Sequence, residues 1–205
     1  MEKTPVKIIV ADDHPLFRSG LVNTIRENSD YIIAGESANG AEALEQIRTL
    51  KPEIAILDIN MPGMNGLEVT KIVNKEKLDT KTIILTMYKD EDYFNEAINL
   101  DVSAYLLKDC ATNEILKCLE EVLSGEYYFS PGVLNYLVKR KSKQRTLTDE
   151  NPGLKDLTVA EKQVLEKVAE NKTSKEIAEE LFISVRTVQN HRNNICTKLN
   201  LKGYN

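Results

Sequence analysis

The sequence lacks any long apolar run. No stretch of the 205 residues approaches the roughly 20 apolar residues that a membrane-spanning helix needs. The start, MEKTPVKIIVADD, reaches acidic residues where a secretory signal would keep its apolar region. Internal repeats and low-complexity tracts are also absent. These absences predict a cytoplasmic protein with no membrane partner, and a hydrophobic content of 41% supports packed cores.

Cysteine is scarce. The three cysteines are odd in number and form no C-x-x-C, which argues against a disulfide framework and against a zinc site. We therefore expect Cys110, Cys118 and Cys196 to be small, buried apolar residues.

Charge is divided unevenly along the chain. Residues 1–126 carry 13 Lys and Arg against 23 Asp and Glu, whereas residues 127–205 carry 14 against 9. From Ser184 onward there are four basic residues and no acid. A basic carboxyl-terminal half suits a polyanionic partner better than the overall net charge of -5 does.

Hydrophobic periodicity predicts an α/β fold for the first part of the chain. Short apolar runs alternate with segments of helical period. This alternation predicts a doubly wound, five-stranded parallel sheet with helices on both faces. The expected strands are residues 6–11, 31–37, 53–57, 81–86 and 103–107.

The second part reads as helical. PGVLNYLVKRK predicts one helix, and the polar stretch SKQRTLTDENPG at 142–153 has no periodicity, so it predicts a linker. Three helical patterns and no strand follow. We therefore predict a first domain at 1–126, a helix and linker at 127–153, and a small all-α domain at 154–205.

Polar residues stand where the expected strands end. Asp12 and Asp13 follow the first strand, Asp58 the third, Thr86 the fourth and Lys108 the fifth. Ligands of open parallel sheets bind outside the carboxyl ends of the strands. Three converging carboxylates repel one another unless a cation lies among them, and such hard oxygen ligands favour Mg²⁺. Acids, metal, lysine and hydroxyl together predict a phosphoryl site.

A plainer interpretation holds for single positions. One Asp at a strand end is usually a helix cap or a loop residue. Asn65 is placed to cap a helix that begins at Gly66, and His14 is expected to be a loop residue. The agreement of four strand ends is what favours a site.

The motifs ADD, D-x-x-M-P-G-M-N-G, LTM and YLLKD fall in order over about the first 125 residues. Together they resemble the receiver domain of bacterial response regulators. The resemblance implies a flavodoxin-like fold with strand order 2-1-3-4-5. It also implies that Asp58 accepts a phosphoryl group from a phosphohistidine of a sensor histidine kinase.

The same resemblance implies a ligand set for Mg²⁺. Asp13 and Asp58 would bind the ion directly, together with the main-chain carbonyl of Asn60, while Asp12 would act through water. The remaining roles concern the phosphate and its detection: Thr86 and Lys108 match the residues that contact the phosphoryl group, and Tyr105 matches the switch aromatic.

One segment departs from the family pattern. Residues 100–104, Leu-Asp-Val-Ser-Ala, replace a turn that is usually rich in Gly and Ala. We therefore do not carry over from the family the conformation of the turn before the fifth strand or the packing behind Tyr105.

SVRTVQNHRNNICTKL predicts a helix with two different faces. Ser184 is a good N-cap, and Val188, Ile195 and Leu199 recur at helical spacing. The opposite face is rich in amides and basic groups, which suits base edges and phosphates in a major groove, although polar faces are usually just solvated. That face comprises Arg186, Gln189, Asn190, Asn193 and Thr197.

The patterns LT-x-x-E-K-x-VL, S-K-E-IA-x-x-L-x-IS, TV-x-x-H and NI-x-x-KL span residues 154–202. They resemble the LuxR-type helix-turn-helix domain of NarL/FixJ response regulators. The resemblance implies that bases are contacted by Gln189, Asn190 and Asn193, and the DNA backbone by Lys175, Arg186, Arg192 and Lys198. Gln189 stands where a lysine is common. Family members usually continue into a final dimerisation helix, which we expect this chain to lack because it stops at Asn205.

We therefore predict a DNA-binding transcriptional regulator that is controlled by phosphorylation and is not an enzyme. Its expected partners are a sensor histidine kinase, double-stranded DNA and a second copy of the chain on activation. Two alternatives stay open: a metal-dependent phosphohydrolase that uses Asp58 as nucleophile, and a regulator that binds DNA without phosphorylation.

Overall fold

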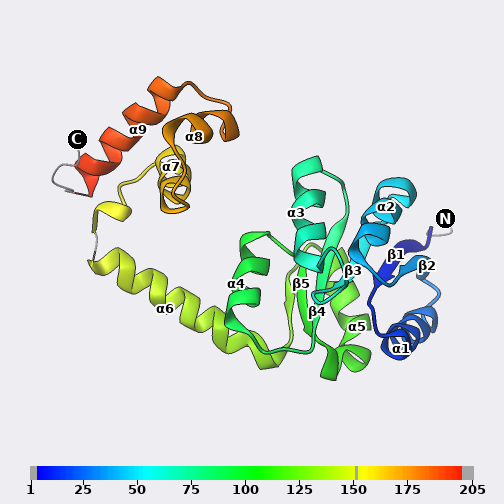
Figure 1. Ribbon diagram of the computed structural model, residues 1–205. Helices are drawn as coiled ribbons and strands as arrows, with labels where there is room; N and C mark the ends of the chain where they lie inside the picture. Colours follow the sequence, from blue (N-terminus) through cyan, green and yellow to red (C-terminus); the bar gives the residue numbers. More distant parts are fainter. Residues whose placement is uncertain (1–3, 151, 200–205) are drawn as a thin grey trace. The chain divides into compact units, whose positions relative to one another are not determined.

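The computed structural model describes residues 4–150 and 152–199, with the side chains of all but residues 143–150 and 152. The chain forms two compact units, Met1–Val138 and Lys139–Asn205, which are described separately below (Figure 1). The predicted domain boundaries at residues 126 and 153 stay a prediction. The two compact units are defined by packing contacts, whereas the predicted domains are defined by function.

The first unit is built on a parallel sheet with the order β2-β1-β3-β4-β5-β6. The first five strands confirm the predicted α/β fold and the order 2-1-3-4-5. Their bounds are β1 (Val6–Ala11), β2 (Tyr31–Ser37), β3 (Ile54–Asp58), β4 (Lys81–Thr86) and β5 (Ala104–Leu107).

The prediction of five strands was wrong by one. A two-residue strand, β6 (Tyr128–Phe129), pairs with β5 at the edge of the sheet. It is held by the Tyr128 N–H donating to the Ser103 carbonyl and the Ser130 N–H donating to the Tyr105 carbonyl. Two residues are too few to show an alternating pattern, so sequence periodicity does not reveal this strand.

Helices cover both faces of the sheet (Figure 1). α1 (Pro15–Arg26) and α5 (Lys108–Leu123) pack on one face, around residues such as Ile8, Ile56 and Leu106. The other three pack on the opposite face: α2 (Gly40–Leu50), α3 (Gly66–Glu76) and α4 (Glu91–Asn99). Because both faces are buried, the strands are almost uninterrupted apolar runs.

The stretch predicted as a linker is largely helical. After a 3₁₀ turn (Pro131–Val133), α6 runs from Leu134 to Glu150, so most of the stretch 142–153 is helical. No Gly or Pro interrupts residues 133–150, and Lys, Arg, Gln and Leu are good helix formers. Their propensity sustains a helix without an apolar stripe, which is why periodicity missed it.

The second unit contains three further helices, as predicted, after a 3₁₀ turn (Pro152–Leu154). They are α7 (Val159–Ala169), α8 (Ser174–Glu180) and α9 (Val185–Lys198). Their core is small and includes Val164, Ile177, Val188 and Ile195. Ser184 caps α9 as predicted, because its side chain accepts from the Thr187 N–H.

The cysteines do not share one environment. Cys118 is buried in the α1/α5 core as predicted, but Cys110 is half-buried and Cys196 is exposed. The prediction was therefore wrong for Cys196, which lies on the polar side of α9. Among the described residues, no helix is both long and apolar enough to cross a membrane.

Candidate functional site

The site is centred on Asp58, the last residue of the buried strand β3. Its side chain is almost inaccessible, and the Lys108 ammonium donates to Asp58 Oδ2 at 2.7 Å. Lys108 Nζ also lies 2.7 Å from Asp12 Oδ2, an ion-pair distance. Strand register explains the convergence, because Asp58 is paired with Leu85 and Thr86 with Leu107, so consecutive strands end together.

An acidic cluster surrounds this lysine. Ligand atoms of Asp12, Asp13, His14 and Asp58 all lie within 4.8 Å of one another. Asp12 and Asp58 are buried, whereas Asp13 and His14 are exposed, and Asp12 Oδ2 has no hydrogen-bond partner despite its nearness to Lys108. One lysine is insufficient for three carboxylates, so the donor set fits a divalent cation with oxygen ligands.

Burial raises the pKa of the Asp58 carboxyl above its ordinary value. The hydrogen bond and charge of Lys108 act in the opposite direction and favour the ionised form, while the Asp12 charge adds to the rise. A cation in the cluster would also favour the carboxylate. The ionised form of the Asp58 carboxyl is thus favoured by positive charge beside it.

A cavity of about 400 Å³ opens above these groups. Its wall includes four of the predicted site residues, namely Asp13, Asp58, Asn60 and Lys108. Sequence reasoning treated His14 as a loop residue, yet it also lines the cavity, with its Nδ1 2.7 Å from Asp13 Oδ1. Met87 and Tyr88 complete the lining, and no pattern in the sequence singled them out.

The turn after Asp58 leads the chain directly into α3. Gly63 has a φ of +79°, which glycine adopts without a steric penalty. Asn65 caps α3 as predicted: it accepts from the Glu68 N–H, while the Glu68 carboxylate accepts from the Asn65 N–H. At Gly66, a Cβ atom would overlap the Asp58 carbonyl oxygen. The missing side chain therefore lets α3 begin directly against the end of β3.

Thr86, at the end of β4, and Tyr105, on β5, are fully buried. The Thr86 hydroxyl accepts from the Tyr88 N–H at 3.0 Å, and the Tyr105 hydroxyl has no hydrogen-bond partner. Burial raises the pKa of Tyr105. The Tyr105 ring packs edge-on against Phe94, which also contacts Phe129 and Tyr136. The aromatic cluster links the predicted switch residue to the first turn of α6.

The unusual turn at 100–104 has its own stabilising contact. Asp101 adopts a left-handed conformation, with a φ of +54°, where glycine is the easiest residue to accommodate. The Tyr127 hydroxyl donates to Asp101 Oδ1 at 2.8 Å. Asp101 therefore combines the turn conformation with a hydrogen bond that glycine could not make.

In the second unit, α9 has the two faces that the sequence predicts. Val188 and Ile195 are buried in the small core. The opposite face is exposed and consists of Arg186, Gln189, Asn190, Asn193 and Thr197. Lys175, on α8, is exposed as well. This face carries amide and guanidinium groups, which can donate hydrogen bonds to base edges and phosphates.

Two predicted backbone-contacting residues are engaged within the unit. Lys198 Nζ donates to the buried Glu161 carboxylate at 2.7 Å and to the Asp156 carbonyl at 2.9 Å. Arg192 is half-buried and donates to the Ser174 hydroxyl at 3.2 Å. These contacts join sequence-distant helices, so helix periodicity cannot reveal them. Both residues hold α9 in place.

The Lys198–Glu161 pair predicts acid sensitivity. Lys198 and the Thr158 N–H lower the pKa of Glu161 to about 2, so the pair stabilises the unit above the ordinary glutamate pKa and is lost as pH falls toward 2. We expect Glu161→Gln to lower the unfolding midpoint of this unit by several degrees at pH 7, with the difference shrinking at pH 3. Thermal melts at both pH values check this, with the exposed Glu179→Gln as control. An equal difference at both pH values would contradict it.

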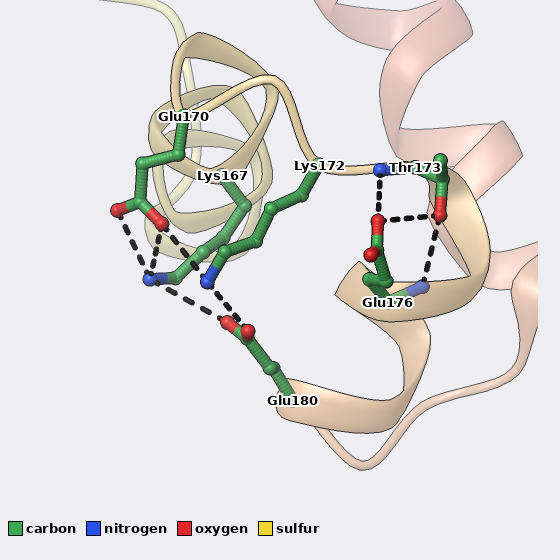
Figure 2. A network of polar contacts seen from close by, with 6 residues as sticks. All are labelled: Lys167, Glu170, Lys172, Thr173, Glu176 and Glu180. Carbon is green, nitrogen blue, oxygen red and sulfur yellow. Dashed lines mark hydrogen bonds and ion pairs between the residues drawn. The ribbon is translucent and has the colours of Figure 1, made fainter.

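A second polar network fixes the connection between α7 and α8 (Figure 2). Glu170 forms ion pairs with Lys167 at 3.1 Å and with Lys172 at 3.0 Å, and both lysines also pair with Glu180. Next to it, Thr173 and Glu176 form the capping box of α8. Lys167 and Lys172 are thus each paired with two acidic residues at the α7–α8 junction.

Two families of known proteins match the chain. The model for the response regulator receiver domain matches residues 8–120, and that for bacterial regulatory proteins of the LuxR family matches residues 155–204. The chain is a response regulator of the NarL/FixJ type. It is 36% identical to the uncharacterized transcriptional regulatory protein YhcZ of Bacillus subtilis, over 95% of this chain and 89% of that protein. It is 34% identical to the oxygen regulatory protein NreC of Staphylococcus haemolyticus, over 96% and 92%.

Solved structures agree with this assignment. The receiver domain of a NarL response regulator from Mycobacterium tuberculosis is 33% identical, with a TM-score of 0.58, over 60% of this chain and 99% of that one. The RcsB–DNA complex, at 23% identity, shows the fold alone, with a TM-score of 0.62 over 98% and 95%. This response regulator is therefore a phosphorylation-controlled transcription regulator. The predicted lack of a final helix concerns residues 200–205 and beyond, outside the described residues.

Proposed function

We propose that Asp58 is the residue that accepts the phosphoryl group. The observation that carries this proposal is the position of Lys108 Nζ, 2.7 Å from the carboxylates of both Asp12 and Asp58 beneath an open cavity. A buried carboxylate next to a fixed cation is an activated nucleophile with a charge partner for the incoming phosphoryl oxygens.

The acidic cluster is proposed to hold Mg²⁺. Asp13, Asp58 and the Asn60 carbonyl would supply direct ligands, and Asp12 would act through water. When bound, the ion neutralises charge on the phosphoryl oxygens. An Asp58 carboxylate oxygen then attacks phosphorus, and the phosphorus–nitrogen bond of a kinase phosphohistidine breaks. The electron pair of that bond stays on the imidazole nitrogen, and a proton on the other ring nitrogen makes the leaving group a neutral imidazole.

A single experiment tests this function. The full chain is incubated with a small phosphodonor, with and without Mg²⁺, and examined by intact mass and by DNA titration. We expect a mass gain of one phosphoryl group that requires Mg²⁺, together with tighter DNA binding. Unchanged mass with Mg²⁺ present, or DNA affinity that ignores the modification, would reject the proposal. The second result would support the phosphorylation-independent alternative.

The phosphohydrolase alternative uses the same carboxylate. A hydrolase needs rapid loss of the phosphoryl group from Asp58, whereas a regulator needs it retained. We propose that Asp58 loses the phosphoryl group only slowly and that the chain does not turn over as a phosphohydrolase. Steady release of many phosphates per chain from a small phosphate ester would favour the enzyme.

The switch is proposed to run from Thr86 to Tyr105. A phosphoryl group on Asp58 gives the Thr86 hydroxyl a stronger acceptor, which draws it away from the Tyr88 N–H that it now contacts. The space vacated beside Tyr105 would let the ring change position, and Phe94 and Tyr136 would follow because they share its cluster. The device shifts a two-state equilibrium.

Thr86→Ala should separate phosphorylation from response. We expect the variant to gain the phosphoryl mass at a similar level but to lose about tenfold of the phosphorylation-dependent gain in DNA affinity, which corresponds to one charge-assisted hydrogen bond of about 1.4 kcal/mol. Thr82→Ala, on the same strand, serves as control. The mechanism fails if phosphorylated Thr86→Ala responds as strongly as wild type.

The exposed face of α9 is proposed to enter the major groove of DNA. Gln189, Asn190 and Asn193 would contact bases, and Arg186 and Lys175 would contact the backbone. The internal contacts of Arg192 and Lys198 make them weaker candidates, with any phosphate contact secondary to holding α9.

Substitutions on α9 should distinguish these roles. We expect Arg186→Ala to weaken binding to every duplex alike and to reduce the salt slope by about one unit. Asn193→Ala should instead change the preference among sequences, by about 1–3 kcal/mol for a lost bidentate contact. Titration of both variants against a panel of duplexes at several salt concentrations tests this. A uniform loss for Asn193→Ala would remove it from the base-reading set.

The remaining partners follow from these roles. We propose that a sensor histidine kinase supplies the phosphoryl group and that two copies of the chain bind adjacent half-sites when phosphorylated, because one helix-turn-helix contacts few bases. Because DNA and a sensor kinase are its proposed partners, we propose that this regulator acts in the cytoplasm.

A further inference from the structure

The positive charge of the carboxyl-terminal half is concentrated outside the helix-turn-helix. Residues 139–145, Lys-Arg-Lys-Ser-Lys-Gln-Arg, contain five basic residues and no acid. We call them the basic segment. Residues 151–205 contain nine basic residues but also seven acidic ones. The basic segment, which spans the end of the predicted helix and the start of the predicted linker, thus carries most of the excess charge.

Several cations of the helix-turn-helix are already paired with acids. Lys167 and Lys172 share Glu170 and Glu180 (Figure 2), and Lys198 is paired with Glu161. These pairs neutralise charge where a DNA-binding domain would otherwise attract phosphates. Electrostatic attraction to phosphates supplies essentially all non-specific DNA affinity. The ion pairs of Lys167, Lys172 and Lys198 therefore lower the positive charge that α7–α9 present to phosphates.

The basic segment has a suitable structure for a polyanion. It lies within α6, a continuous helix that the chain maintains through Glu150. Lys139 and Lys141 are exposed and Arg140 is half-buried. Contacts also group residues from Lys139 onward with α7–α9 in one compact unit. The segment is therefore part of the same folded unit as the proposed recognition helix.

We propose that the basic segment of α6 binds the phosphate backbone of duplex DNA and adds a sequence-independent part of the affinity. This inference rests on the proposed DNA-binding function, and it adds an electrostatic contribution from α6 to the backbone and base contacts of α8 and α9. Charge complementarity selects the partner, because five basic residues within seven positions, without an acid, attract a polyanion such as the phosphate backbone.

The test compares two triple variants of the full chain with equal changes in formal charge. One is Lys139→Gln, Arg140→Gln and Lys141→Gln; the control is Lys7→Gln, Lys71→Gln and Lys75→Gln on the first unit. Glutamine keeps helix propensity close to that of lysine and arginine. Affinity for a non-specific duplex and for a selected binding site is measured from low to high salt.

For the α6 variant we expect the salt slope to fall by about 0.9 for each lost phosphate contact, and affinity for both duplexes at 0.1 M salt to fall at least about eightfold, the value of one contact. The control should match wild type. Lys141→Gln alone, which changes one exposed side chain, should lower the slope by up to about 0.9 and keeps the test decisive if the triple variant unfolds.

Three results would overturn the inference. They are an unchanged slope in the α6 variants, an equal loss in the control, or a loss of binding to anionic lipid vesicles with DNA binding intact. Failure of the proposed function looks different, because wild-type chain would then bind no duplex at any salt concentration, and Asn193→Ala would alter nothing.

Discussion

Asp58→Asn is expected to abolish the mass gain that the wild-type chain shows with a small phosphodonor and Mg²⁺. The amide has no anionic oxygen to attack phosphorus, so we expect the phosphorylation rate to fall at least about a hundredfold, the scale of losing a positioned catalytic group. The fold should survive, because Lys108 keeps its ion pair with Asp12 when the Asp58 charge is removed. Intact mass and a thermal melt of the same sample measure both effects.

The control for this prediction is Asp13→Asn. Asp13 is exposed and contacts His14, and we place it among the Mg²⁺ ligands but not at the phosphorus. Its variant should therefore still be phosphorylated, at a higher Mg²⁺ concentration. Acid-labile phosphate on Asp58→Asn would mean that another residue accepts the group. Full activity of Asp13→Asn at ordinary Mg²⁺ would remove Asp13 from the ligand set.

Gly66→Ala should damage both stability and phosphorylation. The added Cβ would overlap the Asp58 carbonyl oxygen and lie 3.2 Å from the Leu57 Cβ, in backbone that has no room to move. Overpacking of this kind costs about 1–3 kcal/mol in the free energy of unfolding. Relief of the clash moves α3 away from β3 and shifts Asp58 relative to Lys108, so we expect phosphorylation about tenfold slower or worse.

Gly20→Ala provides the matched comparison. Gly20 lies inside α1, and a Cβ atom there would meet nothing within 4 Å. The same chemical change should therefore stabilise the unit by about 0.5–1 kcal/mol, the helix preference for alanine over glycine, and leave phosphorylation unchanged. Denaturant unfolding monitored on both variants tests the contrast. Equal stability of Gly66→Ala and wild type would show that the close approach at Gly66 is unimportant.

Local patterns in the sequence predicted most of the fold and the centre of the site. Buried parallel strands are apolar runs, and their ends are polar because the chain leaves the core there. The position of Asp58 after IAIL and of Lys108 after AYLL therefore predicted where both residues lie. Caps were equally local: Asn65 and Ser184 were predicted correctly because a cap bonds within three residues of itself.

The tertiary structure decided what depends on residues far apart in sequence. The family resemblance implied that Lys198 and Arg192 contact DNA, but Glu161 and Ser174 reach them from other helices. The strand β6 exists because β5 offers it a partner, and Tyr105 joins Phe94 and Tyr136 by packing alone. Periodicity reports which way a side chain faces on its own element. It carries no information about which charged or aromatic group arrives from another element, and such pairings form only when the chain folds.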